Sequence, residues 1–213
     1  MANALFTIGH SVRPLGVFIE LLKNADVQFV VDVRGFPRSR TNPQYNGDTL
    51  PSSLSGSQIG YRHIPELGGR RGRQPNVPRA TNAFWQNESF HNYADYAMGD
   101  DFHTALERLR QLCHSERCAI MCAETLWWQC HRRIISDYLI AAGEVVFHIL
   151  GADHVARAVM TPAAKIGANG VVTYPVDRND NSDARRTMGI SPKKQICCGA
   201  GRLFGTKRTS RPC

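Results

Sequence analysis

The chain has 213 residues, 42% of them hydrophobic and 21% charged, which is enough for one domain with a sizeable core. No apolar run approaches the roughly 20 residues of a membrane helix, and the N-terminus lacks the pattern of a signal peptide. We therefore expect a soluble, cytoplasmic protein with no membrane partner, whose seven cysteines are reduced rather than joined in a disulfide scaffold.

The net charge of +8 is gathered in two regions of the chain. Residues 165–213 hold ten Lys or Arg against three Asp, and residues 34–79 hold eight Arg, no Lys and two acidic residues. The planar guanidinium of arginine suits bidentate binding of phosphate or carboxylate. These regions predict an anionic substrate, with nucleic acid as one candidate. The alternative is a solvated basic surface that binds nothing.

Strand and helix patterns alternate along most of the chain. The predicted strands, in chain order, are 4–9, 27–33, 60–64, 119–122 and 144–150. The predicted helices are marked by Leu15, Phe18, Ile19 and Leu22, by Phe102, Leu106, Leu109 and Leu112, and by the segment 134–142. Residues 35–57 and 67–82 are predicted long loops. The alternation predicts a single α/β domain with a mostly parallel sheet and helices on both faces.

The regular pattern ends near residue 168. From 169 onward the sequence gathers Gly, Asn, Asp, Arg and Lys without periodicity. We predict an α/β domain over residues 1–168 and a basic, poorly ordered C-terminal extension over 169–213. Deleting that extension is expected to leave the fold intact.

Polar side chains follow the predicted strands at the points where the strands end. The carboxyl ends of parallel strands meet at one edge of a sheet, where ligands bind in open α/β folds. We therefore predict a polar pocket at this edge. The residues placed there are His10, Ser11, Asp32, Arg34, His63, Cys122, Glu124, Cys130, His131 and Arg132.

Roles within this pocket follow from residue chemistry. Cys130 is the predicted nucleophile, because a helix N-terminus and the neighbouring His131 and Arg132 favour the thiolate, whereas a close Glu124 carboxylate would oppose it. The predicted catalytic residues are Cys130, Glu124, His131, Asp32 and His10. The predicted substrate-binding residues are Arg34, Arg38, His63, Arg132, Ser11 and Cys122.

Several of these residues have a structural interpretation as well. In this interpretation Asp32 only caps a turn or forms an ion pair with Arg34. His10 is then a hydrogen-bonded structural histidine, and Cys122 a small buried hydrophobe. The tryptophans 127–128 shield the site, stack on a flat ligand, or belong to the core or an interface.

A metal site is a rival to the thiol nucleophile. Cys122, Cys130, His131 and His10 would be its ligands, but their spacing matches no common zinc signature. We predict no metal and no cofactor. A phosphatase-like loop is also disfavoured, because nine residues without a glycine separate Cys122 from Arg132.

Five motifs in the same order resemble one family. They are TIGHS at 7–11, VVDVRGFPRSR at 30–40, Tyr61-x-His63 with Leu67-Gly68-Gly69, MCAE at 121–124 with CHR at 130–132, and HIL at 148–150. The chain resembles, over about residues 4–166, the bacterial and archaeal family called domain of unknown function 488. The resemblance implies an α/β fold and an uncharacterised activity. The segment TLWWQ at 125–129 is bulkier than the linker usual in that family.

The resemblance also implies which polar residues recur in the family. In this chain they are His10, Ser11, Asp32, Arg34, Pro37, Arg38, Ser39, His63, Gly69, Cys122, Glu124, Cys130, His131 and Arg132. Since the resemblance names no reaction, function has to come from the site. The sequence favours an enzyme, a thiol or acid/base hydrolase or transferase, acting on a phosphorylated or nucleic-acid-related substrate. The alternative is a non-catalytic nucleic-acid-binding module that uses the arginine-rich loops and the basic tail.

Overall fold

The computed structural model describes residues 4–176 and is built on a six-stranded sheet of order β3-β2-β4-β1-β5-β6. Five neighbouring strands run parallel, and β6 pairs antiparallel with β5 at one edge. The strands are β1 (Leu5–Gly9), β2 (Phe29–Asp32), β3 (Gly60–His63), β4 (Cys118–Cys122), β5 (Val146–Gly151) and β6 (His154–Arg157). The predicted mostly parallel sheet is confirmed, and β6 is an addition that the sequence pattern did not predict.

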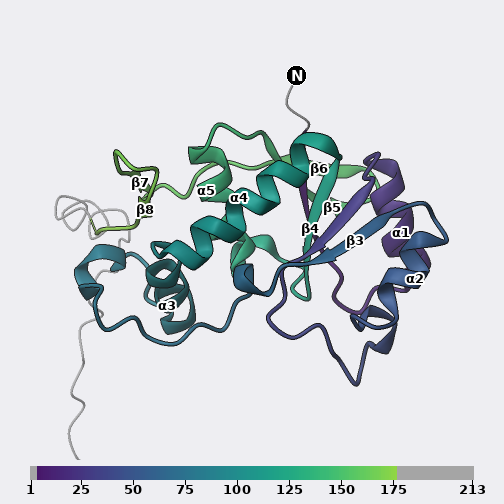
Figure 1. Ribbon diagram of the computed structural model, residues 1–213, viewed down its shortest axis with the longest axis horizontal. Coiled ribbons are helices and arrows are strands. Elements are labelled where there is room, and N and C mark those ends of the chain that lie inside the picture. The colour runs from purple at the N-terminus through teal and green to yellow at the C-terminus, as the bar shows by residue number, and fades with distance from the viewer. Residues whose placement is uncertain (1–3, 177–213) are drawn as a thin grey trace, which may run out of the picture. The chain divides into compact units, whose positions relative to one another are not determined.

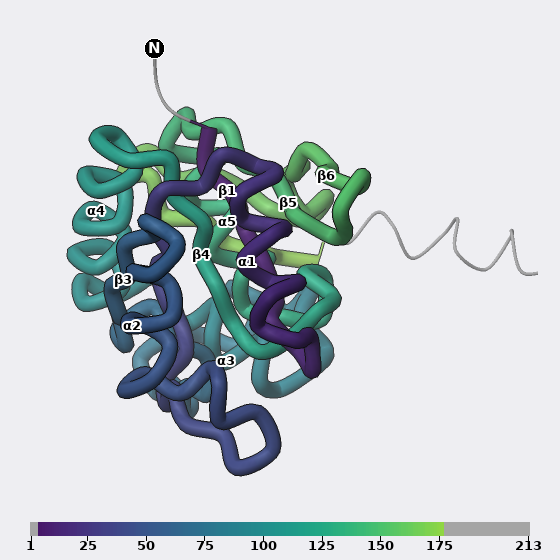
Figure 2. The backbone as a smooth tube through the Cα atoms, turned by 90° about the vertical axis from the view of Figure 1, so that its right-hand side faces the viewer, coloured from purple at the N-terminus to yellow at the C-terminus, as the bar shows by residue number. Residues whose placement is uncertain are grey.

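Helices cover both faces of this sheet, as predicted (Figure 1). One face carries α1 (Leu15–Asn24) and α2 (Leu50–Ser55), which lie in front of the strands in Figure 2. The other face carries α3 (Glu88–Ala97), α4 (Asp100–Ser115) and α5 (Arg132–Ala141).

The period of two along each strand divides the core between these faces. In β4, Ala119 and Met121 pack with the helices α1 and α2. Their neighbours Cys118, Ile120 and Cys122 pack on the opposite side, with α4 and α5. All five side chains are buried, which is typical of an interior parallel strand.

Two helices lie in segments for which no helix was predicted. The short helix α2 falls inside the predicted loop 35–57, and its buried Leu50 and Leu54 are four residues apart. The segment was predicted as a loop because the surrounding Gly, Asn and Ser are typical of loops. Helix α3 begins after Asn87, whose side chain accepts hydrogen bonds from the backbone N–H groups of Ser89 and Phe90.

The predicted boundary at residue 168 is placed too early. Beyond it, β7 (Lys165–Ile166) pairs with β8 (Val172–Thr173), and the side chains of Val172 and Tyr174 are fully buried in the core. The Tyr174 hydroxyl donates to Asp137 Oδ2 at 2.9 Å. The packed domain therefore includes all of 169–176, and the rest of the predicted extension lies outside the described residues. None of the helices within 4–176 is long and apolar enough to cross a bilayer.

Candidate functional site

The carboxyl ends of the parallel strands bring the predicted residues to one edge of the sheet. Asp32 ends β2 in register with His63 at the end of β3 and with Met121 in β4. His10 follows β1, and its backbone N–H donates to the carbonyl of Cys122 at 2.9 Å. The residues that the sequence assigned to one edge are thus found there together.

The loop that follows β4 passes directly against the end of β1. A Cβ atom at Gly9 would lie 1.9 Å from the carbonyl oxygen of Glu124, so only glycine permits this approach. The backbone N–H of Ser11 donates to the carbonyl of Ala123 at 2.9 Å and fixes the two segments. This contact gives the TIGHS motif a physical reason for its glycine.

Cys122 and Cys130 form a buried thiol pair at this edge. Their Sγ atoms lie 2.9 Å apart, and the residues are only 2% and 3% exposed. The backbone N–H of Glu124 donates to Cys122 Sγ at 3.2 Å. The backbone N–H of Arg132, the first residue of α5, donates to Cys130 Sγ at 3.5 Å. Cys130 therefore receives a donor from the start of the helix, as predicted.

The ring of His131 is oriented toward Cys130. Its Nε2–H donates to the carbonyl of Val33 at 2.9 Å, which leaves Nδ1 3.5 Å from Cys130 Sγ. Gly69 lies close against the same ring, where an added Cβ would be 3.0 Å from Nδ1. Of the two histidines predicted as a base, His131 is the one that faces the thiol pair.

The surroundings of the two thiols act on their pKa values in opposite directions. At Cys130 burial raises the pKa, but the hydrogen bond from Cys122, the charge and hydrogen bond of His131 and the charge of Arg132 together hold the pKa well below its ordinary value. At Cys122, burial and the neighbouring Cys130 sulfur raise the pKa well above it. This environment therefore favours a thiolate at Cys130 over one at Cys122. The predicted direction at Cys130 agrees with this environment, while its catalytic role stays a prediction.

Arg132 ties the loop 123–129 down beside the thiol pair. The residue is 1% exposed, and its guanidinium donates to the Glu124 carbonyl at 2.5 Å and to Thr7 Oγ1 at 3.3 Å. The Thr7 hydroxyl donates in turn to His148 Nδ1 at 2.7 Å. The ring of His148 stacks on Trp127 with 4.2 Å between centroids. Arg132 is thus a buried residue that positions this loop, and its predicted role in substrate binding stays a prediction.

Asp32 and Arg34 form a second buried cluster beside the thiols. Arg34 Nη2 lies 2.6 Å from Asp32 Oδ2, and Arg34 Nε lies 2.9 Å from Oδ1. Tyr61 donates its hydroxyl proton to Asp32 Oδ2 at 2.8 Å, and Arg34 Nη2 also donates to the Tyr45 carbonyl at 2.7 Å. The ion-pair alternative for Asp32 therefore describes the geometry. Arg34 is thus buried and its charge is neutralised by Asp32, while its predicted role in substrate binding stays a prediction.

His10 belongs to this second cluster. Its Nδ1–H donates to the Ser11 carbonyl at 2.8 Å, its Nε2 accepts from Arg34 Nη1 at 3.2 Å, and its ring stacks on Tyr45. Burial and the charges of Arg34 and Arg132 lower the pKa of His10 to about 4. His10 is thus neutral near pH 7 with its lone pair occupied. The structural alternative fits this residue better than a role as base.

Three other predicted residues make contacts unlike those expected. The Glu124 side chain is exposed, and its backbone rather than its carboxylate contacts the thiol pair. The Arg38 side chain is 81% exposed and lies 3.7 Å from Asp48. His63 Nε2 donates to the Arg34 carbonyl at 2.7 Å, so its ring supports the loop after β2.

Four residues that support the site were not among the predicted site residues. They are Thr7, Tyr45, Tyr61, which donates to Asp32, and His148. Thr7 and His148 face each other across β1 and β5. Each is a polar residue within an otherwise apolar strand, and such a buried side chain needs a hydrogen-bond partner. This pattern could have indicated the pair from the sequence. Tyr45 had no comparable signal, because it lies in a loop with turn composition.

Of the four residues considered as metal ligands, Cys130 contacts both Cys122 and His131. The fourth, His10, has its Nε2 facing Arg34 instead of the thiol pair. Among residues 4–176, no three His, Cys, Asp or Glu side chains are placed to hold one ion.

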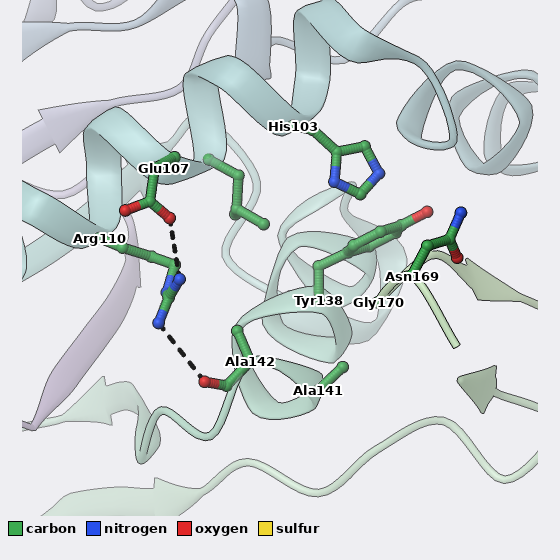
Figure 3. Close-up of a pocket in the computed structure, with 9 residues that line it drawn as sticks. His103, Glu107, Arg110, Tyr138, Ala141, Ala142, Asn169 and Gly170 are labelled. Carbon is green, nitrogen blue, oxygen red and sulfur yellow. Dashed lines mark hydrogen bonds and ion pairs between the residues drawn. The ribbon is translucent and has the colours of Figure 1, made fainter. Parts of the chain in front are cut away.

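A hollow of about 200 Å³ lies elsewhere, between α4, α5 and the turn before β8 (Figure 3). Arg110 crosses it, donating to Glu107 Oε2 at 2.8 Å and toward the Ala142 carbonyl at 3.5 Å. It is smaller than the roughly 300–1,000 Å³ of typical ligand sites, and none of the carboxyl-edge residues lines it. The carboxyl edge is therefore the stronger candidate site.

Fold and site together define an α/β protein with a buried thiol pair at the carboxyl edge of a parallel sheet. The family model described as "Domain of unknown function DUF488" matches residues 14–139, more than half of the chain. The chain belongs to this family. No curated protein and no solved structure matches it. The matched segment contains Asp32, Arg34, both thiols and His131.

Acid is expected to destabilise the protein through two buried histidines. Burial and nearby arginine charge lower the pKa of His10 and of His148 from 6.5 to about 4. Between those values the unfolded chain binds protons that the folded chain does not. The free energy of unfolding is therefore highest above pH 6.5 with respect to these two histidines. It falls as the pH drops toward 4, by up to about 1.4 kcal/mol per pH unit for each histidine.

Urea denaturation at a series of pH values between 4 and 8 measures this slope. His148→Gln removes one of the two titrating groups, so its free energy of unfolding should depend less steeply on pH than that of the wild type. His154→Gln, at an exposed position in the edge strand β6, is the matched control and should leave the slope unchanged. Parallel curves for the wild type and His148→Gln would contradict the assignment.

Proposed function

We propose that the protein is a thiol-dependent enzyme, a hydrolase or transferase, in which Cys130 attacks an electrophilic centre of an anionic substrate. The observation that carries the proposal is the setting of Cys130, whose sulfur accepts from the Arg132 N–H at the start of α5 and lies 3.5 Å from His131 Nδ1. These neighbours and the adjacent Cys122 lower the pKa of Cys130. A thiolate is the nucleophilic form of cysteine, and catalytic thiols sit in environments that lower their pKa.

The neighbours of Cys130 supply the remaining roles. His131 has its Nδ1 3.5 Å from the sulfur and its tautomer fixed by the Val33 carbonyl, an arrangement suited to proton transfer. Cys122 donates a hydrogen bond that stabilises the thiolate. The buried Arg132 balances its charge and holds the covering loop. These contacts orient the nucleophile before any substrate binds.

Exposed arginines in the loops that follow β2 and β3 are suited to hold the substrate's anionic group. Arg40 and Arg70 are exposed, and neither forms a side-chain hydrogen bond or ion pair with the rest of residues 4–176. Arg70 directly follows Gly69, which contacts the His131 ring. Free guanidinium groups bind phosphate and carboxylate in a bidentate manner. A phosphorylated or nucleic-acid-related substrate fits this charge.

A non-catalytic nucleic-acid-binding module is the second candidate. The same exposed arginines favour it, because phosphate contacts from arginine supply most of the affinity in non-specific binding. The two candidates differ at Cys130, which has to be reactive in the enzyme and is indifferent in the binding module. An ordinary thiol at Cys130 in a folded protein would therefore favour the second candidate.

The thiolate at Cys130 is expected to react with an alkylating agent well below the pH that a free cysteine needs. The Cys130-dependent rate, obtained as the difference between the wild type and Cys130→Ser, should titrate with an apparent pKa below the free-thiol value of about 8.5. Mass spectrometry of the labelled peptide measures the rate at each pH.

Two variants of Cys122 sharpen this test. Cys122→Ser keeps a hydroxyl donor for the thiolate, whereas Cys122→Ala removes it. The apparent pKa of Cys130 should therefore be higher in the alanine variant than in the serine variant. Cys113→Ser, in another buried part of the core, is the control and should leave the titration unchanged. Titration of Cys130 at or above about 8.5 would overturn the nucleophile assignment.

A further inference from the structure

The thiol pair has a second chemical property besides nucleophilicity. Cys122 and Cys130 lie 2.9 Å apart, within about 1 Å of the length of a disulfide bond. One ends β4 and the other precedes α5. The loop between them is mostly exposed, so it can absorb a small movement of either cysteine.

We propose that Cys122 and Cys130 are a redox-active dithiol that a small hydroperoxide, such as hydrogen peroxide, converts to an intramolecular disulfide. The disulfide consumes the sulfur that acts as nucleophile, so oxidation switches the site off. This regulatory consequence rests on the proposed function, whereas formation of the disulfide depends only on the thiol pair.

The oxidation proceeds in two balanced steps. The Cys130 thiolate attacks one peroxide oxygen, the O–O bond breaks, and the departing hydroxide takes a proton from solvent, which gives Cys130 sulfenic acid and water. The Cys122 sulfur then attacks the Cys130 sulfur, the S–O bond breaks, and the hydroxide leaves as water with the proton of Cys122. The two sulfurs give up two electrons, which reduce the peroxide to two molecules of water.

Burial determines which oxidants fit this site. With exposures of 2% and 3%, the two sulfurs are closed to a protein disulfide, but a molecule the size of water or peroxide needs only a brief opening of the loop 123–129. The Glu124 N–H that donates to Cys122 and the Arg132 N–H that donates to Cys130 keep both sulfurs in place. We therefore assign the substrate class to small hydroperoxides.

A second cysteine pair in the same core provides an internal control. Cys113 in α4 and Cys118 in β4 are buried and hydrogen-bonded, and that hydrogen bond together with burial raises the pKa of the Cys113 thiol. The charge of Glu144 acts in the same direction and also raises the pKa of Cys113. If proximity and burial alone decided oxidation, both pairs would react alike. The proposal requires that only the pair with a thiolate reacts rapidly.

The test treats the full chain with hydrogen peroxide, blocks the remaining thiols with an alkylating agent and maps the linked peptides by mass spectrometry. A Cys122–Cys130 disulfide should form at least about tenfold faster than a Cys113–Cys118 disulfide, because the rate follows the thiolate fraction. Cys122→Ser should stop at Cys130 sulfenic acid, detected with a sulfenic-acid-specific probe. Replacing Cys197, Cys198 and Cys213 with serine excludes exchange with those cysteines.

Two outcomes would overturn the proposal. One is a Cys122–Cys130 pair that stays reduced while Cys113 and Cys118 are oxidised. The other is a Cys122→Ser variant that gives no sulfenic acid at Cys130. If Cys130 is alkylated at low pH and still forms no disulfide, only this inference fails. If the disulfide forms but Cys130 titrates as an ordinary thiol, the proposed function fails instead.

Discussion

Asp32→Asn is expected to destabilise the protein by about 3–5 kcal/mol, because it leaves the buried guanidinium of Arg34 without its counter-charge. Arg34 is 8% exposed and reaches both oxygens of Asp32, which is itself fully buried. The same change weakens the hydrogen bond from Tyr61. Urea denaturation measures the loss in the free energy of unfolding from the shift in the midpoint at an unchanged m-value.

Asp48→Asn is the matched control for this substitution. Asp48 also faces an arginine, Arg38, but at 3.7 Å and with both side chains largely exposed. Such a surface pair contributes little, so the change in stability should stay below about 1 kcal/mol. The double variant Asp32→Asn/Arg34→Met, which removes both charges, should recover part of the loss. A similar small effect for both single variants would contradict a buried ion pair.

Ending the chain at residue 168 is expected to cost at least about 3–5 kcal/mol, the range for deleting a large buried aromatic side chain. The truncation removes Val172 and Tyr174, both fully buried. It also removes the Val172 carbonyl, which accepts a hydrogen bond from the Tyr138 hydroxyl. The Tyr174 hydroxyl, which donates to Asp137 Oδ2, is lost as well. A chain ending at residue 176 keeps all of these contacts and should unfold like the full chain.

A single substitution separates the packing from the hydrogen bond. Tyr174→Phe keeps the ring but removes the donor to the buried Asp137, and is expected to cost about 1–3 kcal/mol. Thermal and urea unfolding of the two truncated chains and of this variant give the comparison. If the chain ending at 168 unfolds as cooperatively and at the same midpoint as the full chain, the C-terminal segment does not stabilise the core.

The parts of the fold that followed from the sequence are those with a strong apolar pattern. The interior strands β1, β2 and β4 are runs of buried apolar residues, and their alternation with helices determined the parallel sheet. Helix α2 was hidden because only Leu50 and Leu54 carry its pattern. The contribution of Tyr174 was hidden because a single aromatic residue in a polar segment has no period.

The candidate site was predictable at the level of the sheet edge but not at the level of partners. Topology alone places Asp32 and Cys122 at the ends of parallel strands. The direction of each side chain depends on loop backbone, which no periodicity describes. Arg34 and Arg38 thus look alike in sequence, yet one is buried in an ion pair and the other is exposed. For Glu124 the backbone contacts the site while the carboxylate faces solvent.

The loop 123–129 leaves and re-enters the core at two adjacent sulfur atoms. Trp127 stacks on His148 and the Glu124 carbonyl accepts from Arg132, whereas Leu126 and Trp128 are 38% and 43% exposed. Substitutions at the two exposed positions leave the contacts between the loop and the core in place. The outer surface of this loop can therefore change during evolution while the sulfur atoms at its ends keep their positions.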